Sequence, residues 1–235
     1  MLRTTGFGFA AGCALAGAAW AVRGRSSAVF GPSVWRGKPG RKAIAITFDD
    51  GPSPSTPLFL DALAQHKTPA TFFQVGANVL RHQDTVRSVL AAGHEIGNHS
   101  HSHFNFAMKA ASLINDDFTR AQSAIAEVTG APPTLMRAPY GVRWPGFREM
   151  QAKLGLLGVM WTVIGLDWKL PAAAIADRVL SRATDGGIIC LHDGRGTREN
   201  PDVKPALEAV RLIIPALIAA GYHFESVSQL LCHKI

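Results

Sequence analysis

Short apolar runs alternate along the chain with longer stretches that carry helical periodicity, and few folds accommodate this order. In the longest stretch, 109–129, apolar side chains recur at three- and four-residue steps before Gly130 ends the pattern. The apolar runs predict seven strands, near 43–48, 70–75, 94–98, 134–138, 156–161, 187–192 and 222–226. Helices are expected between them, near 56–66, 77–92, 109–129, 145–154, 171–184 and 203–220. Strands separated by helices pair in parallel, which predicts an α/β sheet wound into an open layer or a barrel.

Chemically active side chains collect where these predicted strands end. Asp49 and Asp50 follow the first strand, and His99 and His103 follow the third. The later strand ends carry Arg137 to Tyr140, then Asp167 and Trp168, and finally His192. Because the carboxyl ends of parallel strands meet at one edge of a sheet, we expect these side chains to share one site.

Two neighbouring carboxylates, Asp49 and Asp50, stand in the segment ITFDDGPSPST, residues 46–56. An Asp-Gly-Pro sequence is ordinary turn chemistry, and a turn is needed where a strand ends. Successive side chains at a strand end point in different directions, so the pair can also serve two tasks. One carboxylate would bind a cation while the other addresses a water molecule. Taken alone, these residues leave both interpretations open.

The segment GNHSHSHF, residues 97–104, supplies candidate ligands for that cation. His99 and His103 are four residues apart, so a helical turn would bring their rings to one face, with His101 facing away. Together with Asp50 they form a set of two histidines and one carboxylate that leaves coordination positions open. Zinc is the commonest occupant of hydrolytic sites of this kind, but open-site iron proteins use the same ligands. The alternative is a group of polar loop histidines.

The segments RAPYG, residues 137–141, and IICLHD, residues 188–193, offer further catalytic groups. Arg137 can hold a nearby carboxylate through a bidentate pair, and a backbone N–H beside Pro139 can donate to an oxyanion. His192 is either a structural histidine or a general acid oriented by Asp167. Trp168 either stacks on a sugar ring or fills the core.

The formal net charge of +7 comes from one end of the chain. Residues 1–42 hold seven bases and no acid, which leaves 17 bases against 17 acids in the remainder. The part of the chain expected to fold is therefore formally neutral. This balance gives no indication of a nucleic-acid partner.

The N-terminal segment predicts targeting to the cell envelope. Arg3 precedes an uncharged run rich in Ala and Gly, 4–22, which is typical of a secretory signal peptide. An uncleaved membrane anchor is the alternative, and the bases that follow it leave a cytoplasmic orientation open. We therefore expect a periplasmic, secreted or membrane-anchored protein. The expected division is a signal peptide or anchor at 1–26, a basic linker at 27–42 and one domain at 43–235.

Three cysteines, Cys13, Cys190 and Cys232, form neither an even set nor a CxxC pair. A lipidated Cys13 has weak support because the preceding residues lack the usual leucine. Cys190, inside an apolar run, is expected to be a small buried hydrophobic residue. Cysteine usage therefore does not fix the compartment, and the sequence does not indicate an oligomeric state.

Five motifs, in order across about 41–228, resemble those of the polysaccharide deacetylase family, the NodB-homology domain of family 4 carbohydrate esterases. They are TFDDGPSP, HSHSH, RAPYG, the dipeptide DW and IICLHDG. Two departures stand out. Ile164 occupies the position of the first Asp in the usual D-x-x-D-W motif, and Phe104 replaces a common proline.

This resemblance implies a distorted (β/α) barrel of seven or eight parallel strands with the active site at their C-terminal ends. It also implies a hydrolase that removes N-acetyl groups from a GlcNAc-containing glycan and releases acetate. Peptidoglycan, a chitooligosaccharide or a related envelope saccharide would be the substrate. The implied cofactor is a divalent metal, Zn²⁺ before Co²⁺ or another ion.

The resemblance further assigns roles to individual residues. The catalytic set is Asp49 as general base, Arg137 as its partner, His192 as general acid and Asp167 as its support. The metal ligands are Asp50, His99 and His103, and the substrate-binding set is Pro139, Tyr140, Trp168 and Leu191. Tyr140 would act through its backbone N–H, while Leu191 and Trp168 would line the acetyl pocket.

Two rival functions stay open at this point. The same site would serve an O-acetyl esterase that acts on an acetylated polysaccharide such as xylan, because an ester is the easier bond to cleave. A catalytically silent glycan-binding domain on the same fold is the second rival. A lipid-linked sugar as substrate would suit the N-terminal segment, but no residue singles it out.

Overall fold

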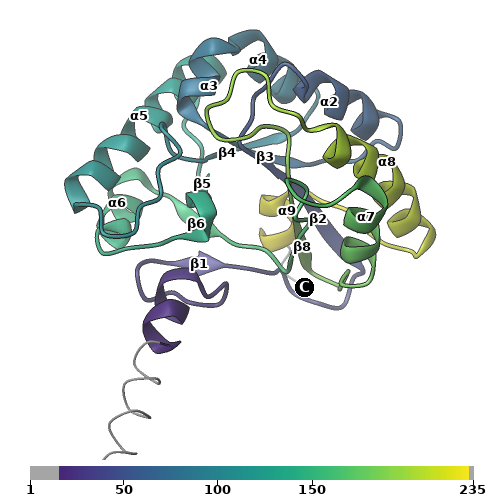
Figure 1. Cartoon of the computed structure of the whole chain (residues 1–235), viewed down its shortest axis with the longest axis horizontal. Coiled ribbons are helices and arrows are strands. Elements are labelled where there is room, and N and C mark those ends of the chain that lie inside the picture. The colour runs from purple at the N-terminus through teal and green to yellow at the C-terminus, as the bar shows by residue number, and fades with distance from the viewer. Residues whose placement is uncertain (1–15, 233–235) are drawn as a thin grey trace, which may run out of the picture.

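A curled, all-parallel sheet forms the centre of the molecule (Figure 1), and the computed structural model describes residues 16–232. Eight strands follow one another in the order β1-β6-β5-β4-β3-β2-β8-β7, and β9 pairs separately with β2. Their bounds are β1 Ser33–Val34, β2 Ala43–Asp49, β3 Thr71–Gln74, β4 Glu95–Asn98, β5 Leu135–Met136, β6 Leu157–Val159, β7 Val163–Ile164, β8 Gly187–His192 and β9 His223–Phe224. Within the described chain β1 and β7 do not pair with each other, so the barrel is open on one side.

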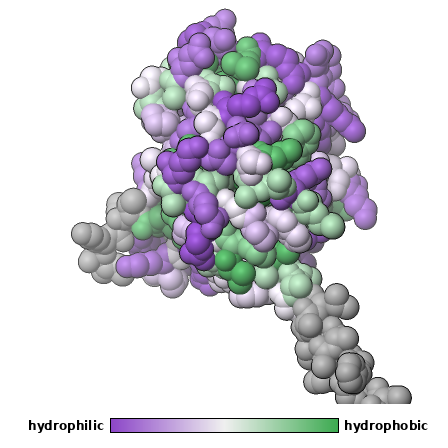
Figure 2. Space-filling view, turned by 90° about the vertical axis from the view of Figure 1, so that its left-hand side faces the viewer, coloured by the Kyte–Doolittle hydropathy of each residue, from purple (hydrophilic) through white to green (hydrophobic). Residues whose placement is uncertain are grey.

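Helices cover the outer face of this sheet (Figure 1). They are α2 Thr56–Ala64, α3 Gly76–Arg81, α4 Gln83–Ala91, α5 Ala111–Thr129, α6 Phe147–Leu154, α7 Ala172–Leu180 and α8 Lys204–Ala219. A 3₁₀ turn spans Pro139–Gly141, and the C-terminal helix α9, Val227–Cys232, packs against the inner face instead. The outer surface on the side of α5 and α6 is largely polar with scattered apolar residues (Figure 2). This agrees with α5, which turns Ile114, Phe118 and Ile125 inward.

The predicted fold class is confirmed, and the differences lie in short elements. The expected helix at 77–92 is two helices, because the backbone of His82 leaves the helical region at φ −128° and ψ 46°. The two-residue strands β1 and β7 and the C-terminal α9 were not predicted. A two-residue strand has no periodicity that a sequence pattern could show.

The central pair of strands, β2 and β8, divides its side chains between two cores. Ile44, Ile46 and Phe48 pack toward the helices in the larger core, together with Ile189 and Leu191. The alternate positions of both strands face the inside of the curl, where Ala43, Ala45 and Ile188 pack against α9. Each large apolar side chain buried here contributes roughly 1.5–3 kcal/mol.

This alternation also sets the position of the chemistry. Thr47 and Asp49 of β2 face inward, as do Cys190 and His192 of β8. The strands pair in register, with Asp49 opposite His192. Two strand ends rich in functional groups are therefore fixed side by side by main-chain hydrogen bonds.

The segment expected as a linker, 27–42, packs against the domain. β1 pairs with β6, and Arg41 forms a two-pronged ion pair with Glu225, at 2.7 Å from Nη1 to Oε1 and 3.0 Å from Nη2 to Oε2. Asp185 accepts hydrogen bonds from the backbone N–H groups of Arg41 and Ala43. These contacts make the segment part of the folded unit.

The chain before this segment is held by Arg143. Residues 16–23 are helical, and the buried Arg143 donates to the carbonyls of Gly24 and Ser27 while its backbone N–H donates to Val22. Most of the predicted signal peptide or anchor, 1–15, and Cys13 lie outside the described residues. Within 16–232, no helix is both long enough and apolar enough to cross a membrane.

Candidate active site

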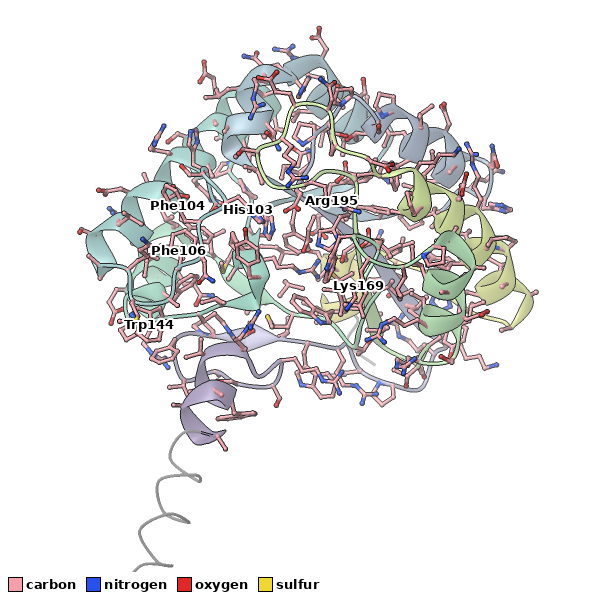
Figure 3. All side chains as sticks on the ribbon, in the orientation of Figure 1. His103, Phe104, Phe106, Trp144, Lys169 and Arg195 are labelled. Carbon is pink, nitrogen blue, oxygen red and sulfur yellow. The ribbon has the colours of Figure 1, made fainter. Side chains whose placement is uncertain are left out.

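A cavity of about 960 Å³ opens at the C-terminal ends of the strands. Most of the residues singled out from the sequence line it: Asp49, Asp50, His99, His103, Tyr140, Asp167, Trp168 and His192. Arg137, Pro139 and Leu191 are not among the lining residues. Figure 3 shows His103 facing this hollow from the side of α5, with Arg195 and Lys169 toward α7 and α8.

Asp50, His99 and His103 form a compact group of three metal-binding atoms. The Nε2 atoms of His99 and His103 lie 3.3 Å and 2.8 Å from Oδ1 of Asp50. The His99 Nδ1–H donates to the Arg137 carbonyl at 2.7 Å, so its Nε2 presents a lone pair to Asp50.

This donor set fits a divalent cation. The buried Oδ1 of Asp50 has no hydrogen-bond partner among the described residues. Because Nδ1 of His99 donates to a carbonyl, Nε2 of the neutral His99 ring is an acceptor that faces this oxygen. Acceptors that face one another in a buried site are satisfied by a cation, and two histidines with one carboxylate leave coordination positions free. The identity of the ion does not follow from these contacts.

The histidines converge through a loop, and the expected helical turn at 99–103 is wrong. Ser100 and His103 have positive φ angles of 64° and 53°, which a helix does not allow. Asp117 of α5 holds this loop by accepting from the backbone N–H groups of His101 and Ser102 at 2.7 Å and 3.1 Å. The rings of His99 and His103 nevertheless lie with centroids 5.2 Å apart.

His101 faces away from this group, as expected. Its Nε2 lies 2.9 Å from Nη2 of Arg120, and because a guanidinium only donates, the ring nitrogen accepts. Burial, reinforced by Arg120, lowers the pKa of His101. Its role is to pack the loop against α5.

Asp49 lies beside this group and is held by Arg137. Nη1 of Arg137 donates to Oδ1 of Asp49 at 2.6 Å and to Oγ1 of Thr47 at 2.7 Å. The other guanidinium nitrogens donate to the carbonyls of Val159 and Met160. The pair is thus a single contact rather than the expected bidentate one. Arg137 is fully buried, so its charge and that of Asp49 offset each other.

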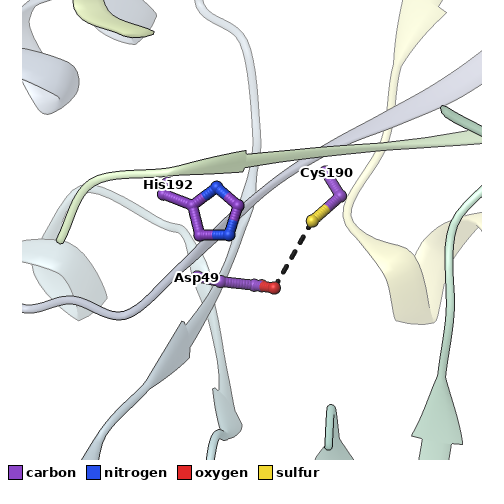
Figure 4. A group of neighbouring side chains, drawn as sticks. All are labelled: Asp49, Cys190 and His192. Carbon is purple, nitrogen blue, oxygen red and sulfur yellow. Dashed lines mark hydrogen bonds between the residues drawn. The ribbon is translucent and has the colours of Figure 1, made fainter. Parts of the chain in front are cut away.

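The second oxygen of Asp49 faces a thiol that the sequence analysis did not connect with the site (Figure 4). Sγ of Cys190 lies 3.4 Å from Oδ2 of Asp49, and burial, with the Asp49 charge, raises the pKa of Cys190 well above its ordinary value. The residue therefore donates as a thiol. The sequence does contain a feature that could have predicted this contact. Cys190 lies two residues before His192 on the same strand, so both side chains point to the same face of the sheet.

The same alternation excludes Leu191 from the cavity. Leu191 is fully buried beside Phe48 in the core between sheet and helices. Its expected place in the acetyl pocket is a one-residue error, because neighbouring strand positions face opposite sides of a sheet. Cys190 takes the inward-facing position, where it is fully buried and likewise not among the residues that line the cavity.

His192 is oriented by Asp167. Its Nδ1 lies 2.8 Å from Oδ1 of Asp167, and its backbone N–H donates to Oδ2 at 2.8 Å. Burial would lower the pKa of His192, but the Asp167 carboxylate and its hydrogen bond, with Asp50 and Asp49, raise it to about 9. The imidazole is therefore charged at neutral pH, with its other ring nitrogen available to the cavity.

Two exposed aromatic residues flank the cavity. Trp168 is 51% exposed and lies edge-on to His192 with ring centroids 5.3 Å apart, so it does not fill the core. Tyr140 is 54% exposed and lies edge-on to His103. Its φ is 58°, and its backbone N–H has no hydrogen-bond partner within the described chain. Pro139 is buried and shapes this turn.

Two further polar residues brace the site: Asn78 lies outside every motif, and Asp193 lies within IICLHDG but was assigned no role. Nδ2 of Asn78 donates to the Asp50 and Gly196 carbonyls, both at 2.8 Å. Asp193 accepts from Oγ1 of Thr56 at 2.5 Å, and burial raises the pKa of Asp193 to about 7. Both residues tie the turn after β2 to the segment after β8.

Ile164, which stands where a carboxylate is usual, lines the cavity with an apolar side chain. Arg137 does not depend on a second carboxylate, because Thr47 and two carbonyls take its remaining donors. The substitution therefore leaves the Asp49 contact intact and makes this part of the wall apolar.

Comparisons with known proteins agree with this arrangement. The family model described as polysaccharide deacetylase matches residues 36–159. The chain is 36% identical over 200 residues to the chitooligosaccharide deacetylase of Bradyrhizobium sp., covering 81% of this chain and 91% of that protein. It is 34% identical over 211 residues to the peptidoglycan-N-acetylglucosamine deacetylase PgdA of Listeria monocytogenes, covering 89% of this chain but only 43% of that protein. The solved structure of the Bc1960 peptidoglycan N-acetylglucosamine deacetylase superimposes with a TM-score of 0.80 at 28% identity, covering 86% and 94% of the two chains.

Proposed function

The chain belongs to the polysaccharide deacetylase family, and from this premise we propose that it hydrolyses N-acetyl groups of a GlcNAc-containing glycan and releases acetate. The observation that carries the proposal is one cavity lined by a carboxylate base, a three-ligand cation site and a charged histidine. The names of the relatives support a peptidoglycan or chitooligosaccharide substrate.

Asp49 is suited to remove a proton from the attacking water. Arg137 and Cys190 fix its two oxygens, so the carboxylate is held in one orientation at the cavity wall. Asp50, His99 and His103 would hold a divalent cation, Zn²⁺ first, which would supply Lewis acidity and lower the pKa of a bound water. The unpartnered N–H of Tyr140 is a donor for the oxyanion that forms at this carbonyl.

His192 is suited to complete the reaction. Its imidazolium, oriented by Asp167, donates a proton to the amide nitrogen as the carbon–nitrogen bond breaks. Acetate and a free amino sugar leave the site. The exposed faces of Trp168 and Tyr140 are suited to hold the pyranose ring beside these groups.

Two substitutions separate the base from the cation site. Asp49→Asn should reduce acetate release from chitooligosaccharides by about 10²–10⁴-fold while bound metal is retained. His99→Ala should lose both activity and metal, and His66→Ala, at an exposed position at the end of α2, should lose neither. Acetate is measured enzymatically and metal by elemental analysis. A fully active Asp49→Asn enzyme would refute the mechanism.

Assays on several substrates distinguish the N-deacetylase from the two rival functions, an O-acetyl esterase and a catalytically silent glycan-binding domain. N-acetylchitooligosaccharides, peptidoglycan and acetyl-xylan are compared with the same metal-reconstituted protein. Preference for acetyl-xylan would establish an esterase, and tight glycan binding without acetate release would establish a silent binding domain.

We also propose that residues 1–26 direct the protein to the cell envelope as a signal peptide or anchor. The uncharged run 4–22 between Arg3 and Arg23 supports this proposal. The intact mass of the protein from the envelope fraction tests it, since cleavage and anchoring leave different N-termini.

A further inference from the structure

One wall of the cavity carries basic side chains that the proposed reaction does not use. Lys169, Arg195 and Arg198 line it, while Arg23 lines the cavity beside Tyr140, to whose carbonyl its Nη2 donates at 3.5 Å. Apart from Asp49, Asp50 and Asp167, only Asp202 is acidic among the described lining residues. Figure 3 shows Arg195 and Lys169 together on the side of α7 and α8. Both belong to the segments that follow β7 and β8.

This concentration of positive charge is local. The chain from residue 43 onward holds equal numbers of bases and acids. A basic overall composition therefore does not account for three cations, Lys169, Arg195 and Arg198, at one cavity. Their convergence on a concave surface focuses the electrostatic potential there.

Among the described residues, the catalytic carboxylates leave Lys169 and Arg198 unpaired, whereas Nη1 of Arg195 lies 3.7 Å from Oδ2 of Asp167. Asp49 is offset by Arg137 and Asp167 by His192. Within residues 16–232, Lys169 and Arg198 form no ion pair and their side chains make no hydrogen bond. Solvated lysines and arginines on loops are common, but these two face a cavity already lined for a ligand.

Arg195 is the fixed member of the group. Its Nη1 donates to the Gly194 carbonyl and its Nη2 to the Asp167 carbonyl, both at 2.9 Å. Its side chain is only 15% exposed. These contacts hold the guanidinium in place at the cavity wall, so it need not be ordered when a ligand binds.

We propose that this wall, formed by Lys169, Arg195 and Arg198, binds an anionic group on the glycan. A phosphoryl or carboxylate group next to the sugar that is deacetylated matches the donors, because guanidinium and ammonium groups form their strongest hydrogen bonds with such oxygens. The inference rests on the proposed function, since it specifies the substrate of the same site. It makes the preferred glycan a charged one.

Matched oligosaccharides test this inference on the full, metal-loaded chain. Acetate release is compared for a neutral N-acetylchitooligosaccharide, for the same oligosaccharide with a reducing-end phosphate, and for one carrying a muramic-acid carboxylate. We expect kcat/KM to be about tenfold higher or more for a charged substrate, as expected for one charge-assisted contact. The advantage should shrink between about 0.05 M and 0.5 M salt as screening increases.

Charge variants assign the preference to the wall. In Lys169→Gln/Arg198→Gln the charged-to-neutral ratio of kcat/KM should fall toward one, mainly through KM, and in Lys169→Glu/Arg198→Glu it should fall below one. Arg182→Gln, at an exposed position beyond the end of α7, is the matched control and should keep the wild-type ratio.

The outcomes are distinct. Acetate release from none of the substrates would reject the proposed function itself. Equal kcat/KM for neutral and charged substrates would reject the anionic site and leave the deacetylase proposal standing. A preference that survives Lys169→Gln/Arg198→Gln would also reject the assignment to this wall. Preference for phosphate alone or carboxylate alone would support the site and identify its source.

Discussion

Asp49 and Arg137 form a charge pair that is shut off from water. Arg137 is fully buried and Asp49 is 3% exposed, and their contact measures 2.6 Å. Both charges lose their hydration on folding, so each depends on the other. Any change on one side leaves an uncompensated charge inside the sheet.

Arg137→Met should therefore lower the free energy of unfolding by about 3–5 kcal/mol, because it strands the Asp49 carboxylate. Denaturant unfolding of the metal-free protein measures this loss. In Arg137→Met/Asp49→Asn the loss should be partly recovered, and a double-mutant cycle with no coupling between the two sites would contradict the pairing.

His192 gives the site a defined pH dependence. The pKa of His192 is raised in the folded protein to about 9, chiefly by Asp167 against the effect of burial. The charged form therefore stabilises the fold fully below the unfolded pKa of about 6.5, and this stabilisation is lost as the pH rises through about 9. Activity should fall over the same upper range, because the general acid is then deprotonated.

Unfolding free energies of the metal-free wild type and His192→Gln, measured from pH 6 to pH 10, should differ most at the acidic end and converge above about pH 9. The wild-type pH–rate profile should lose activity on its alkaline side. A difference in stability that grows with pH would show that His192 is neutral in the fold.

At the scale of single elements, α5 controls the loop that carries two of the three cation ligands. Asp117 of α5 accepts from two backbone N–H groups between His99 and His103. Its neighbour Asp116 is exposed and makes no contact with that loop. The two adjacent carboxylates of one helix thus differ in their connection to the site.

Asp117→Ala should weaken metal binding by about 10–100-fold, because partners that position ligands contribute this much to affinity. Calorimetric titration with Zn²⁺ measures the change, and activity should return at higher metal concentration. Asp116→Ala serves as the control and should bind like the wild type. Unchanged affinity in Asp117→Ala would mean that the loop holds its shape without α5.

The individual strands and helices also show which features of the site can be predicted from the sequence and which cannot. The strands that end at Asp49 and His192 were predicted because short apolar runs alternate with helical stretches, and their shared edge was predicted because parallel strands end at one edge. The contacts of Cys190 and Asp117 were not predicted, because they depend on which face of an element distant in the sequence is turned toward the site. The prediction for Leu191 was wrong for a related reason. A correctly predicted strand does not by itself show which of its side chains face the cavity and which face the helices.

At the scale of the whole molecule, the segment before β2 is wrapped onto the domain. Arg143 holds it from within by donating to the carbonyls of Gly24 and Ser27, and β1 extends the sheet at β6. The sequence of this segment, rich in Pro, Gly and bases, predicted a linker. Its anchoring partners lie more than one hundred residues away, so local composition could not reveal them.

Arg143→Met should release this segment and leave two buried carbonyls unpaired, at a cost of about 1–3 kcal/mol each at most. Hydrogen exchange of residues 22–36 should accelerate, with little change in α8. Arg148→Met removes exposed contacts to the carbonyls of Ala28 and Val29 and should have a smaller effect. Equal protection in all three proteins would contradict the anchoring role.

The in-register pairing of Asp49 with His192 separates two kinds of change available to this molecule. The proton-transferring groups are spaced by adjacent strands, whereas the basic cavity wall belongs to the segments after β7 and β8. Substitutions of Lys169 and Arg198 at the wall leave this spacing, and the contact of Asp167 with His192, untouched. Homologous proteins can therefore differ in substrate preference while they keep the same catalytic chemistry. For the same reason, an engineer can change the basic wall without changing the pair of Asp49 and His192.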